Sequence, residues 1–387
     1  MRIGLITGEY PPMQGGVGDF TRELARALID LGHAVVVIMS SSVPPLVDSP
    51  VQVEPIISKW NLSCWRAISD AARRLRLDVL NIQYEPAAYA MQIGINFFPW
   101  WYRRQSNRVP VVTTFHDLRV PYLFPKAGPL RWKIVDLLAR HSDAVIATNE
   151  EDHLALSSKL TNYPIIHLIP IGSNIPPSLP LGFDRERERA RWGASDHDWL
   201  IAYFGFLSMS KGGLALLRSI GLLLNDGLPA RLLLIGGRTG SSDPSNAQYA
   251  AEVDRALAAL GLRDRVHFTG YVDPAQVTAA MAAADVMALP YADGVSFRRG
   301  SLMAALAHGK AIVTTHPRAV IPQLKDGENC VLVAPGDAGA LSTGIRRVMA
   351  EPGLRARLEA GALELSRQFT WDAIAARTAE VYRGVIR

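Results

Sequence analysis

Short apolar runs alternate with helical patterns along the whole of this 387-residue chain, and this alternation restricts the fold more than any other feature. Runs such as Ile3–Thr7 and Leu200–Phe204 are mostly apolar, as buried parallel strands are. Between runs, side chains such as Phe20, Leu24 and Leu28 repeat at helical spacing. The pattern predicts an α/β protein in which helices cover both faces of parallel sheets.

A proline-rich segment divides the alternation into two halves. The sequence IPPSLPLG at residues 175–182 can form neither a helix interior nor a central strand. The chain is also too long for one ordinary core. We therefore predict two Rossmann-like, doubly wound domains, over residues 1–176 and 177–368. A helix over residues 369–387 either packs on the second domain or returns to the first.

Charge and cysteine content narrow the class of protein. A net charge of +5 and a pI near 9.2 favour anionic partners. The basic residues are scattered and no zinc-finger or RNA-binding signature accompanies them, so nucleic acid is not an expected partner. Cys64 and Cys330 fall in different halves, which argues for a reducing compartment. Without a signal-peptide pattern or a membrane-spanning run, we expect a cytoplasmic protein.

An anion-binding pattern stands in the second half, where a glycine-bearing loop meets a helix. Arg298 and Arg299 occupy this junction, so two guanidinium groups accompany the free N–H groups and the positive end of the helix dipole. Lys211 begins another helix shortly after Gly205, in the loop that follows the first strand of this half. A lysine at that position can meet a phosphate as a point charge. We predict a diphosphate site.

Two loops of the first half carry further candidates. Gly15, Gly16 and Gly18 lead into the first helix, where glycines let backbone N–H groups approach a phosphate or a sugar hydroxyl. A turn that needs glycine only for its dihedral angles is an equally good interpretation. His116 and Asp117 follow the fourth apolar run and could orient a hydroxyl or pass a proton. Their alternative is a structural, hydrogen-bonded turn.

Taken in order, these motifs resemble those of the retaining, nucleotide-sugar-dependent glycosyltransferases of the two-Rossmann-domain GT-B type, and within it the family-four group. The resemblance runs through GGVG at Gly15–Gly18, FHD at Phe115–Asp117, KG at Lys211–Gly212, FTG at Phe268–Gly270 and FTW at Phe369–Trp371. It implies domains that face each other across a cleft. The second would hold the sugar donor and the first a hydroxyl acceptor, with no metal and no other cofactor.

The resemblance gives roles to His116, Lys211, Gly15 and Gly16, and the loops that follow the strands supply the other candidates. His116 and Lys211 are expected to be catalytic. The residues expected at the donor diphosphate and sugar are Gly15, Gly16, Gly205, Lys211, Ser296, Arg298, Arg299, Gly300, Ser301 and Leu302. Those expected beside the nucleobase are Gly236, Gly237 and Tyr271, and those on the acceptor side are Gly18, His116 and Asp117.

Two departures from the family pattern concern the donor. Phe206 stands where the family commonly has an arginine. Ser296 and Ala304 stand where it has two glutamates, the first touching the sugar and the second the ribose. We hypothesise that Arg298 and Arg299 compensate by binding phosphate. A catalytically inactive GT-B protein that still binds a nucleotide sugar is the main alternative. A hydrolase or epimerase of nucleotide sugars, or a binder of other phosphates, also stays open.

The acceptor is the least constrained part, and a saccharide, a lipid-linked acceptor and a small molecule all stay open. The segment NFFPWWYRR at residues 96–104 interleaves aromatic and basic side chains, as a segment in peripheral contact with a membrane does. An ordinary buried helix whose aromatic side chains belong to the core is the interpretation we favour.

Overall fold

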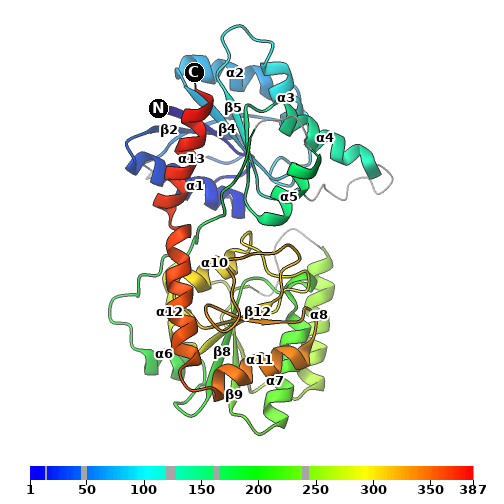
Figure 1. Cartoon of the computed structure of the whole chain (residues 1–387), viewed down its shortest axis with the longest axis vertical. Coiled ribbons are helices and arrows are strands. Elements are labelled where there is room, and N and C mark those ends of the chain that lie inside the picture. Colours follow the sequence, from blue (N-terminus) through cyan, green and yellow to red (C-terminus); the bar gives the residue numbers. More distant parts are fainter. Residues whose placement is uncertain (14, 45–49, 119–127, 160–164, 238–243, 387) are drawn as a thin grey trace. The chain divides into compact units, whose positions relative to one another are not determined.

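The structure is a computed structural model that describes residues 1–13, 15–44, 50–118, 128–159, 165–237 and 244–386, without the side chains of 128–131 and 244–248. The chain forms two compact units (Figure 1). Unit 1 comprises Met1–Asn174 and Thr370–Arg387, and unit 2 comprises Ile175–Phe369. The change from unit 1 to unit 2 thus falls at the start of the proline-rich segment.

Unit 1 is built on a seven-stranded parallel sheet. In spatial order its strands are β3 (Gln52–Ile57), β2 (Ala34–Ser40), β1 (Arg2–Ile6), β4 (Val79–Tyr84), β5 (Val111–Phe115), β6 (Ala144–Ala147) and β7 (Ile166–Leu168). The strand order reverses between β1 and β4, and ligands of doubly wound sheets bind at such a point. The sequence pattern missed β3, because this edge strand is mostly half-buried and contains Pro55.

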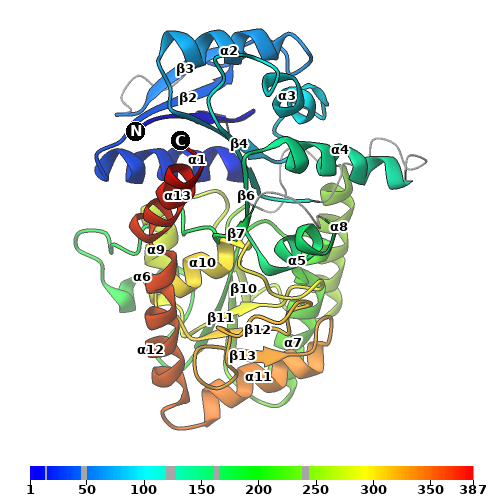
Figure 2. The same cartoon turned by 45° about the horizontal axis from the view of Figure 1, so that its top comes forward.

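Helices cover both faces of this sheet. They are α1 (Gly16–Asp30), α2 (Cys64–Arg74), α3 (Gly94–Tyr102), α4 (Gly128–His141), α5 (Glu150–Lys159) and α13 (Trp371–Val385). Side chains alternate along each strand, so Leu5 joins the core beneath α1 and α13 whereas Ile6 joins the core beneath α2 and α3. Figure 2 shows α1 and α13 side by side on their face of the sheet.

The carboxyl-terminal helix α13 belongs to unit 1. Thr370 caps it by accepting a hydrogen bond from the Ala373 N–H at 3.3 Å. Tyr382 is fully buried, and its hydroxyl donates to Asn81 Oδ1 at 2.9 Å. The sequence left open whether this segment packs on the second domain or returns to the first. In the structure it returns to the first unit.

Unit 2 repeats the plan with a six-stranded parallel sheet. In spatial order its strands are β10 (Val266–Phe268), β9 (Ala230–Ile235), β8 (Trp199–Phe204), β11 (Val286–Leu289), β12 (Ile312–Thr315) and β13 (Val331–Val333). Its helices are α6 (Arg185–Arg191), α7 (Gly213–Asn225), α8 (Pro244–Ala259), α9 (Pro274–Ala283), α10 (Gly300–Ala307), α11 (Ala338–Ala350) and α12 (Leu354–Ser366). Here the strand order reverses between β8 and β11.

An ion network around the buried carboxylate of Asp285 involves two arginines of the charged segment RERERAR, which forms α6. Arg185 and Arg189 of α6 donate to Asp285 at 2.6 and 2.8 Å. Arg355 of α12 donates to the same carboxylate at 2.9 Å. Asp285 precedes β11, at the amino end of the sheet, so this network holds helices to the sheet on the side opposite to the ligand-binding loops.

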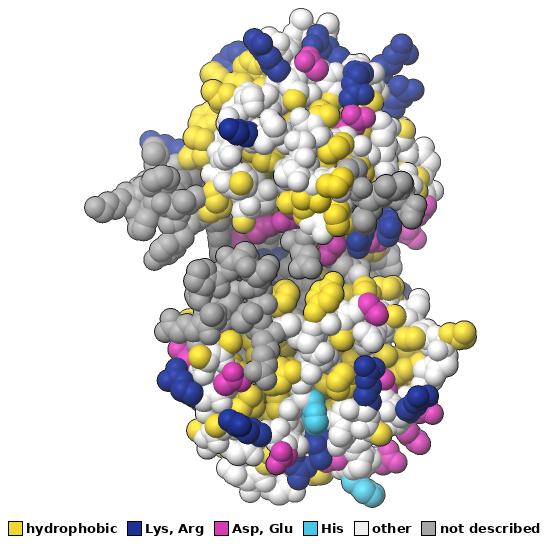
Figure 3. Space-filling model, turned by 180° about the vertical axis from the view of Figure 1, so that it is seen from behind, with side chains coloured by type: hydrophobic (Ala, Val, Ile, Leu, Met, Phe, Trp, Pro, Cys, Tyr) yellow, Lys and Arg dark blue, Asp and Glu magenta, His cyan; other side chains and the backbone are white. Residues whose placement is uncertain are grey.

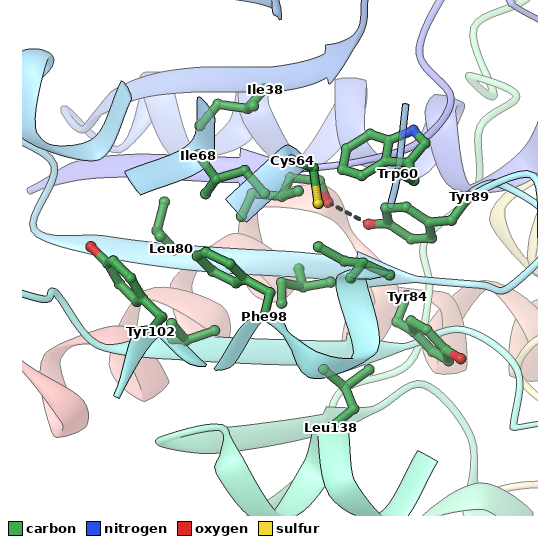
Figure 4. Close-up of a cluster of buried hydrophobic side chains, with 14 of the residues drawn as sticks. Ile38, Trp60, Cys64, Ile68, Leu80, Tyr84, Tyr89, Phe98, Tyr102 and Leu138 are labelled. Atoms are coloured by element: carbon green, nitrogen blue, oxygen red, sulfur yellow. Dashed lines mark hydrogen bonds between the residues drawn. The ribbon is translucent and has the colours of Figure 1, made fainter. Parts of the chain in front are cut away.

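The aromatic segment of α3 packs largely into unit 1. Phe98 and Tyr102 are buried among apolar side chains (Figure 4), and Trp101 stacks on Trp65 with ring centroids 5.4 Å apart. This packing agrees with the interpretation as a core helix. In the described part of the chain no helix combines the length and the apolar character that crossing a bilayer requires. Peripheral contact with a membrane stays a prediction.

Candidate functional site

Two loops predicted to act together meet at the carboxyl edge of unit 2. One follows β8 and the other follows β11, and the Ala292 N–H of the second donates to the Ser210 carbonyl of the first at 2.8 Å. Gly212 has a φ of 73°, and a Cβ atom there would lie 1.9 Å from the Pro290 carbonyl oxygen. The loops can approach this closely only because residue 212 is a glycine.

Lys211 lies in the centre of this edge. A Cβ atom on Gly205, whose φ is 118°, would lie 3.0 Å from Lys211 Nζ, so the missing side chain makes room for the ammonium group. Burial lowers the pKa of Lys211 to about 8, and the neighbouring charge of Arg299 lowers it as well. Two cations are therefore held close together, which favours an anion between them.

The two arginines share one carboxylate. Arg299 Nη2 donates to Asp293 Oδ1, and Arg298 Nη2 lies 3.7 Å from Asp293 Oδ2. The Arg299 guanidinium also lies over the Tyr291 ring, 4.9 Å from its centroid. Among the described side chains of this group, three cations accompany one carboxylate. We call Lys211, Asp293, Arg298 and Arg299 the cationic cluster.

Two buried polar atoms beside the cluster have no hydrogen-bond partner among the described residues. They are Ser296 Oγ and Arg299 Nε, and Ser296 is 8% exposed. Buried polar groups in folded proteins are nearly always paired. Both atoms can donate, so they suit a ligand that carries oxygen acceptors.

The residues that begin α10 are less available than the sequence suggested. The Ser301 hydroxyl lies 2.7 Å from the Tyr291 hydroxyl, and the Leu302 N–H donates to the Arg299 carbonyl at 2.9 Å. The Leu302 side chain is fully buried, whereas Gly300 is exposed. Contacts of these three residues with a donor stay predictions.

The loops after β9 and β10 reach the same edge. Gly236 forms a bridge to Gly270, its N–H donates to Thr269 Oγ1 at 3.0 Å, and a Cβ atom on it would lie 3.5 Å from the Gly205 backbone. Gly237 follows directly. Tyr271 is 78% exposed, so its ring is open to solvent. Their place beside a nucleobase stays a prediction.

Phe206 adds no charge where the family commonly has an arginine. Its side chain is 43% exposed, and Lys211 Nζ lies 6.0 Å from the centroid of its ring. Among the described residues of the loops after β8 and β11, positive charge comes from the cationic cluster.

A carboxylate holds the start of α1 at the carboxyl edge of unit 1. Glu9 Oε1 accepts hydrogen bonds from the N–H groups of Val17 and Gly18 at 3.0 and 3.2 Å. A Cβ atom on Gly15 would lie 2.1 Å from the Glu9 carboxyl group, so this approach needs a glycine at 15. These two N–H groups thus already have an acceptor. A role of Gly15 and Gly16 at a donor phosphate stays a prediction.

His116 is a neutral, oriented imidazole. Its Nε2 lies 2.9 Å from Gln83 Oε1, and its ring meets Phe20 edge to face with centroids 4.6 Å apart. Burial lowers the pKa of His116 to about 3. Of the two roles that the sequence suggested, a neutral imidazole suits the orientation of a hydroxyl group better than proton donation.

The same edge carries two acids that the sequence analysis did not single out. Glu9 follows β1 and Glu85 follows β4, while the predicted residue Asp117 follows the neighbouring strand β5. Burial, together with the charges of Glu9 and Asp117, raises the pKa of Glu85 to about 7. Position in the loop that follows a strand was the available signal for both glutamates. Within the described ranges, no three His, Cys, Asp or Glu side chains are grouped as a metal ion requires.

The surface shows charge of both signs. On the face drawn in Figure 3, Lys and Arg side chains are scattered over both units with Asp and Glu among them. No continuous basic stripe is visible among the described side chains of that face.

Two protein-family models match the chain, one in each unit. The model described as Glycosyltransferase Family 4 matches residues 14–173, and the model described as Glycosyl transferases group 1 matches residues 199–351. The chain is also 26% identical over 398 residues to a phosphatidyl-myo-inositol mannosyltransferase from Mycolicibacterium smegmatis. That alignment covers 100% of this chain and 94% of the relative.

Solved structures resemble the chain over the length of both units. A sucrose-phosphate synthase from Thermosynechococcus elongatus superposes with a TM-score of 0.76 at 21% identity, over 99% of this chain and 98% of that one. HepE from Anabaena, solved in complex with UDP, superposes with a TM-score of 0.80 at 19% sequence identity. The superposition covers 99% of this chain and 100% of HepE. These likenesses confirm the predicted fold of two doubly wound α/β domains.

Proposed function

Because this chain belongs to the group 1 glycosyltransferases of the GT-B fold, we propose that it transfers a sugar from a nucleoside diphosphate sugar to a hydroxyl acceptor with retention of anomeric configuration. The observation that carries this proposal is the cationic cluster at the carboxyl edge of β8 and β11. The UDP bound in the Anabaena relative supports it, since UDP carries the diphosphate that such a cluster suits.

In the proposed reaction, negative charge develops on the departing diphosphate. Lys211 and Arg299, held together before the ligand arrives, stabilise that charge without reorganising, and fixed charges of this kind are the strongest catalytic device in many enzymes. We expect no metal ion and no other cofactor, because the chain supplies these cations itself. The diphosphate oxygens then accept the proton of the attacking hydroxyl as the sugar bond breaks on the same face.

Unit 1 has the role of holding the acceptor in this proposal. His116 is neutral and fixed by Gln83, so it can orient a hydroxyl group of the acceptor or of the sugar. The chemical class of the acceptor stays as open as in the sequence: a saccharide, a lipid-linked molecule or a small molecule.

A protein that binds a nucleotide sugar without transferring it is the second candidate. It is favoured by one observation, namely that Ser296 and Ala304 provide no carboxylate where the family commonly has two glutamates. The cationic cluster alone serves binding as well as catalysis.

The test has two stages. Thermal-shift measurements with UDP, GDP and ADP, and with their sugars, should show stabilisation by RT ln(1 + [L]/Kd), about 2.7 kcal/mol at 100 times Kd. The sugar form of the best ligand is then incubated with the protein and free sugar is measured. Slow sugar release supports the transferase, and binding without any release indicates the inactive binder. If no nucleotide stabilises the protein, both candidates fail.

A further inference from the structure

A buried chain of hydrogen bonds connects the helix α13 to His116 within unit 1. The Tyr382 hydroxyl donates to Asn81 Oδ1 at 2.9 Å, and Gln83 Nε2 donates to the same oxygen. Gln83 Oε1 then lies 2.9 Å from His116 Nε2. Tyr382, Asn81 and Gln83 are fully buried. Because buried polar groups are stable only when donors meet acceptors, the direction of each bond in this chain can be deduced.

Asn81 fixes the direction of the chain. Its Nδ2 lies 3.2 Å from the carbonyl oxygen of Val112, and a carbonyl oxygen can only accept a hydrogen bond. The nitrogen of the Asn81 amide must therefore face Val112, so its oxygen faces Tyr382 and Gln83. Burial raises the pKa of Tyr382, so its hydroxyl keeps the proton that it donates.

Gln83 passes this constraint on to His116. If Gln83 Oε1 faced Asn81 Oδ1, two acceptors would meet without a proton between them, so Gln83 must present its nitrogen to Asn81 and its oxygen to His116. With its pKa lowered to about 3 by burial, His116 is neutral near pH 7 and carries one N–H and one lone pair. The ring nitrogen beside the Gln83 oxygen must be the one that carries the proton.

We infer that Gln83, oriented by Asn81 and Tyr382, is a positioning residue that keeps the His116 proton on Nε2 and leaves Nδ1 as an acceptor for a substrate hydroxyl group. His116 is only half-buried, and no described residue is hydrogen-bonded to its Nδ1. A group that meets Nδ1 must donate, which a hydroxyl group can do and an ether, carbonyl or ionised phosphate oxygen cannot. The contact with substrate rests on the proposed function, whereas the position of the proton does not.

The first experiment locates the proton directly. Long-range ¹H–¹⁵N correlation spectra are recorded on the full chain with ¹⁵N-labelled histidine, and His116→Gln identifies the resonances of His116 among those of the nine histidines. We expect one tautomer, with a protonated Nε2 and an unprotonated Nδ1, that does not change between pH 6 and pH 8. A proton on Nδ1, or an exchanging mixture of both tautomers, would overturn the inference.

Two buried variants separate the role of Gln83 from a general loosening of the core. Gln83→Met keeps the length of the side chain and removes the acceptor of Nε2–H, so the tautomer ratio should shift roughly 5- to 100-fold towards Nδ1–H. Tyr382→Phe is the matched control, because Val112 still orients Asn81 and the tautomer should not change. An unchanged tautomer in Gln83→Met, or an equal shift in Tyr382→Phe, would show that Gln83 does not set the position of the proton.

The contact with substrate is tested by the rate of sugar release from the nucleotide sugar that stabilises the protein. Gln83→Met should lower this rate roughly three- to tenfold, because the neutral hydrogen bond from the substrate hydroxyl to Nδ1 is weakened. The dissociation constant of the nucleoside diphosphate should not change, since its site is assigned to unit 2. An unchanged rate would overturn the contact at Nδ1. If the original chain releases no sugar, the proposed transfer fails, while the spectra still decide where the proton of His116 lies.

Discussion

The carboxyl edges of the two sheets have the same architecture, but the described loops carry side chains of opposite charge. In the described loops of unit 2, Lys211, Arg298 and Arg299 lie together with the carboxylate of Asp293. In unit 1, the loops after β1, β4 and β5 instead carry Glu9, Glu85 and Asp117.

The helix starts at these two edges differ in the same way. The N–H groups at the start of α1 are bound by the carboxylate of Glu9. The start of α10 has no side-chain cap, and the residue at its cap position is itself a cation, Arg299. The difference teaches that the doubly wound fold supplies two equivalent positions for a ligand. Loop side chains then decide which of them is left open to an anion.

The largest effect on the difference between the two edges is expected when Lys211 of unit 2 is removed. Lys211→Ala should lower the transfer rate by about 10²- to 10³-fold, because a fixed charge at the leaving group is lost. The rate is measured as sugar released from the donor under saturating conditions. Lys325→Ala, at an exposed lysine paired with Glu328, is the matched control and should retain activity. An unchanged rate in Lys211→Ala would exclude the catalytic role.

The arginines come next in expected effect. Alanine at Arg298 or Arg299 should raise the dissociation constant of the nucleoside diphosphate at least tenfold, since each guanidinium contributes charge to the cluster. Titration calorimetry measures the effect. Asp293→Asn provides the opposite change, because it removes the internal counter-charge while keeping the shape, and it should not weaken binding. Alanine variants that bind like the original chain would refute the compensation by Arg298 and Arg299.

The pH dependence of binding sharpens the comparison further. Lys211 is charged below its pKa of about 8 and loses its proton as the pH rises through that value. Binding of a diphosphate favours the charged form, so the dissociation constant should rise about tenfold between pH 7 and pH 9. Lys211→Arg stays charged over this range and should show a flat profile. A steep profile in that variant would assign the titration to another group.

The smallest effect is expected in unit 1. Glu9→Ala should lower the free energy of unfolding by about 1 kcal/mol, because it leaves two N–H groups of α1 without their acceptor. Glu9→Gln keeps an oxygen acceptor and should lose less. Urea denaturation monitored by circular dichroism measures both. Equal losses in the two variants would show that the charge of Glu9, and not its hydrogen bonds, stabilises the helix start.

Much of the fold could be predicted from the sequence. Buried parallel strands are almost continuous apolar runs, and all six strands of unit 2 coincide with such runs. The edge strand β3 was not predicted, because it is only half-buried and its sequence is not a continuous apolar run. The basic residues of the candidate site were also recognisable, since they follow strands. The bonds from Glu9 to α1 and from Asp293 to Arg299 were not, because they join residues whose approach depends on the folded loops.

The placement of α13 has a consequence for how the protein is made. Unit 1 uses residues on both sides of unit 2 in the sequence, and its core includes Ile374 and Tyr382. A ribosome therefore delivers every residue of unit 2 before it delivers the helix that completes unit 1. During synthesis the surface of α1 that α13 covers stays exposed until α13 has been made. Unit 1 is therefore begun first but completes its fold only after all of unit 2 has been synthesised.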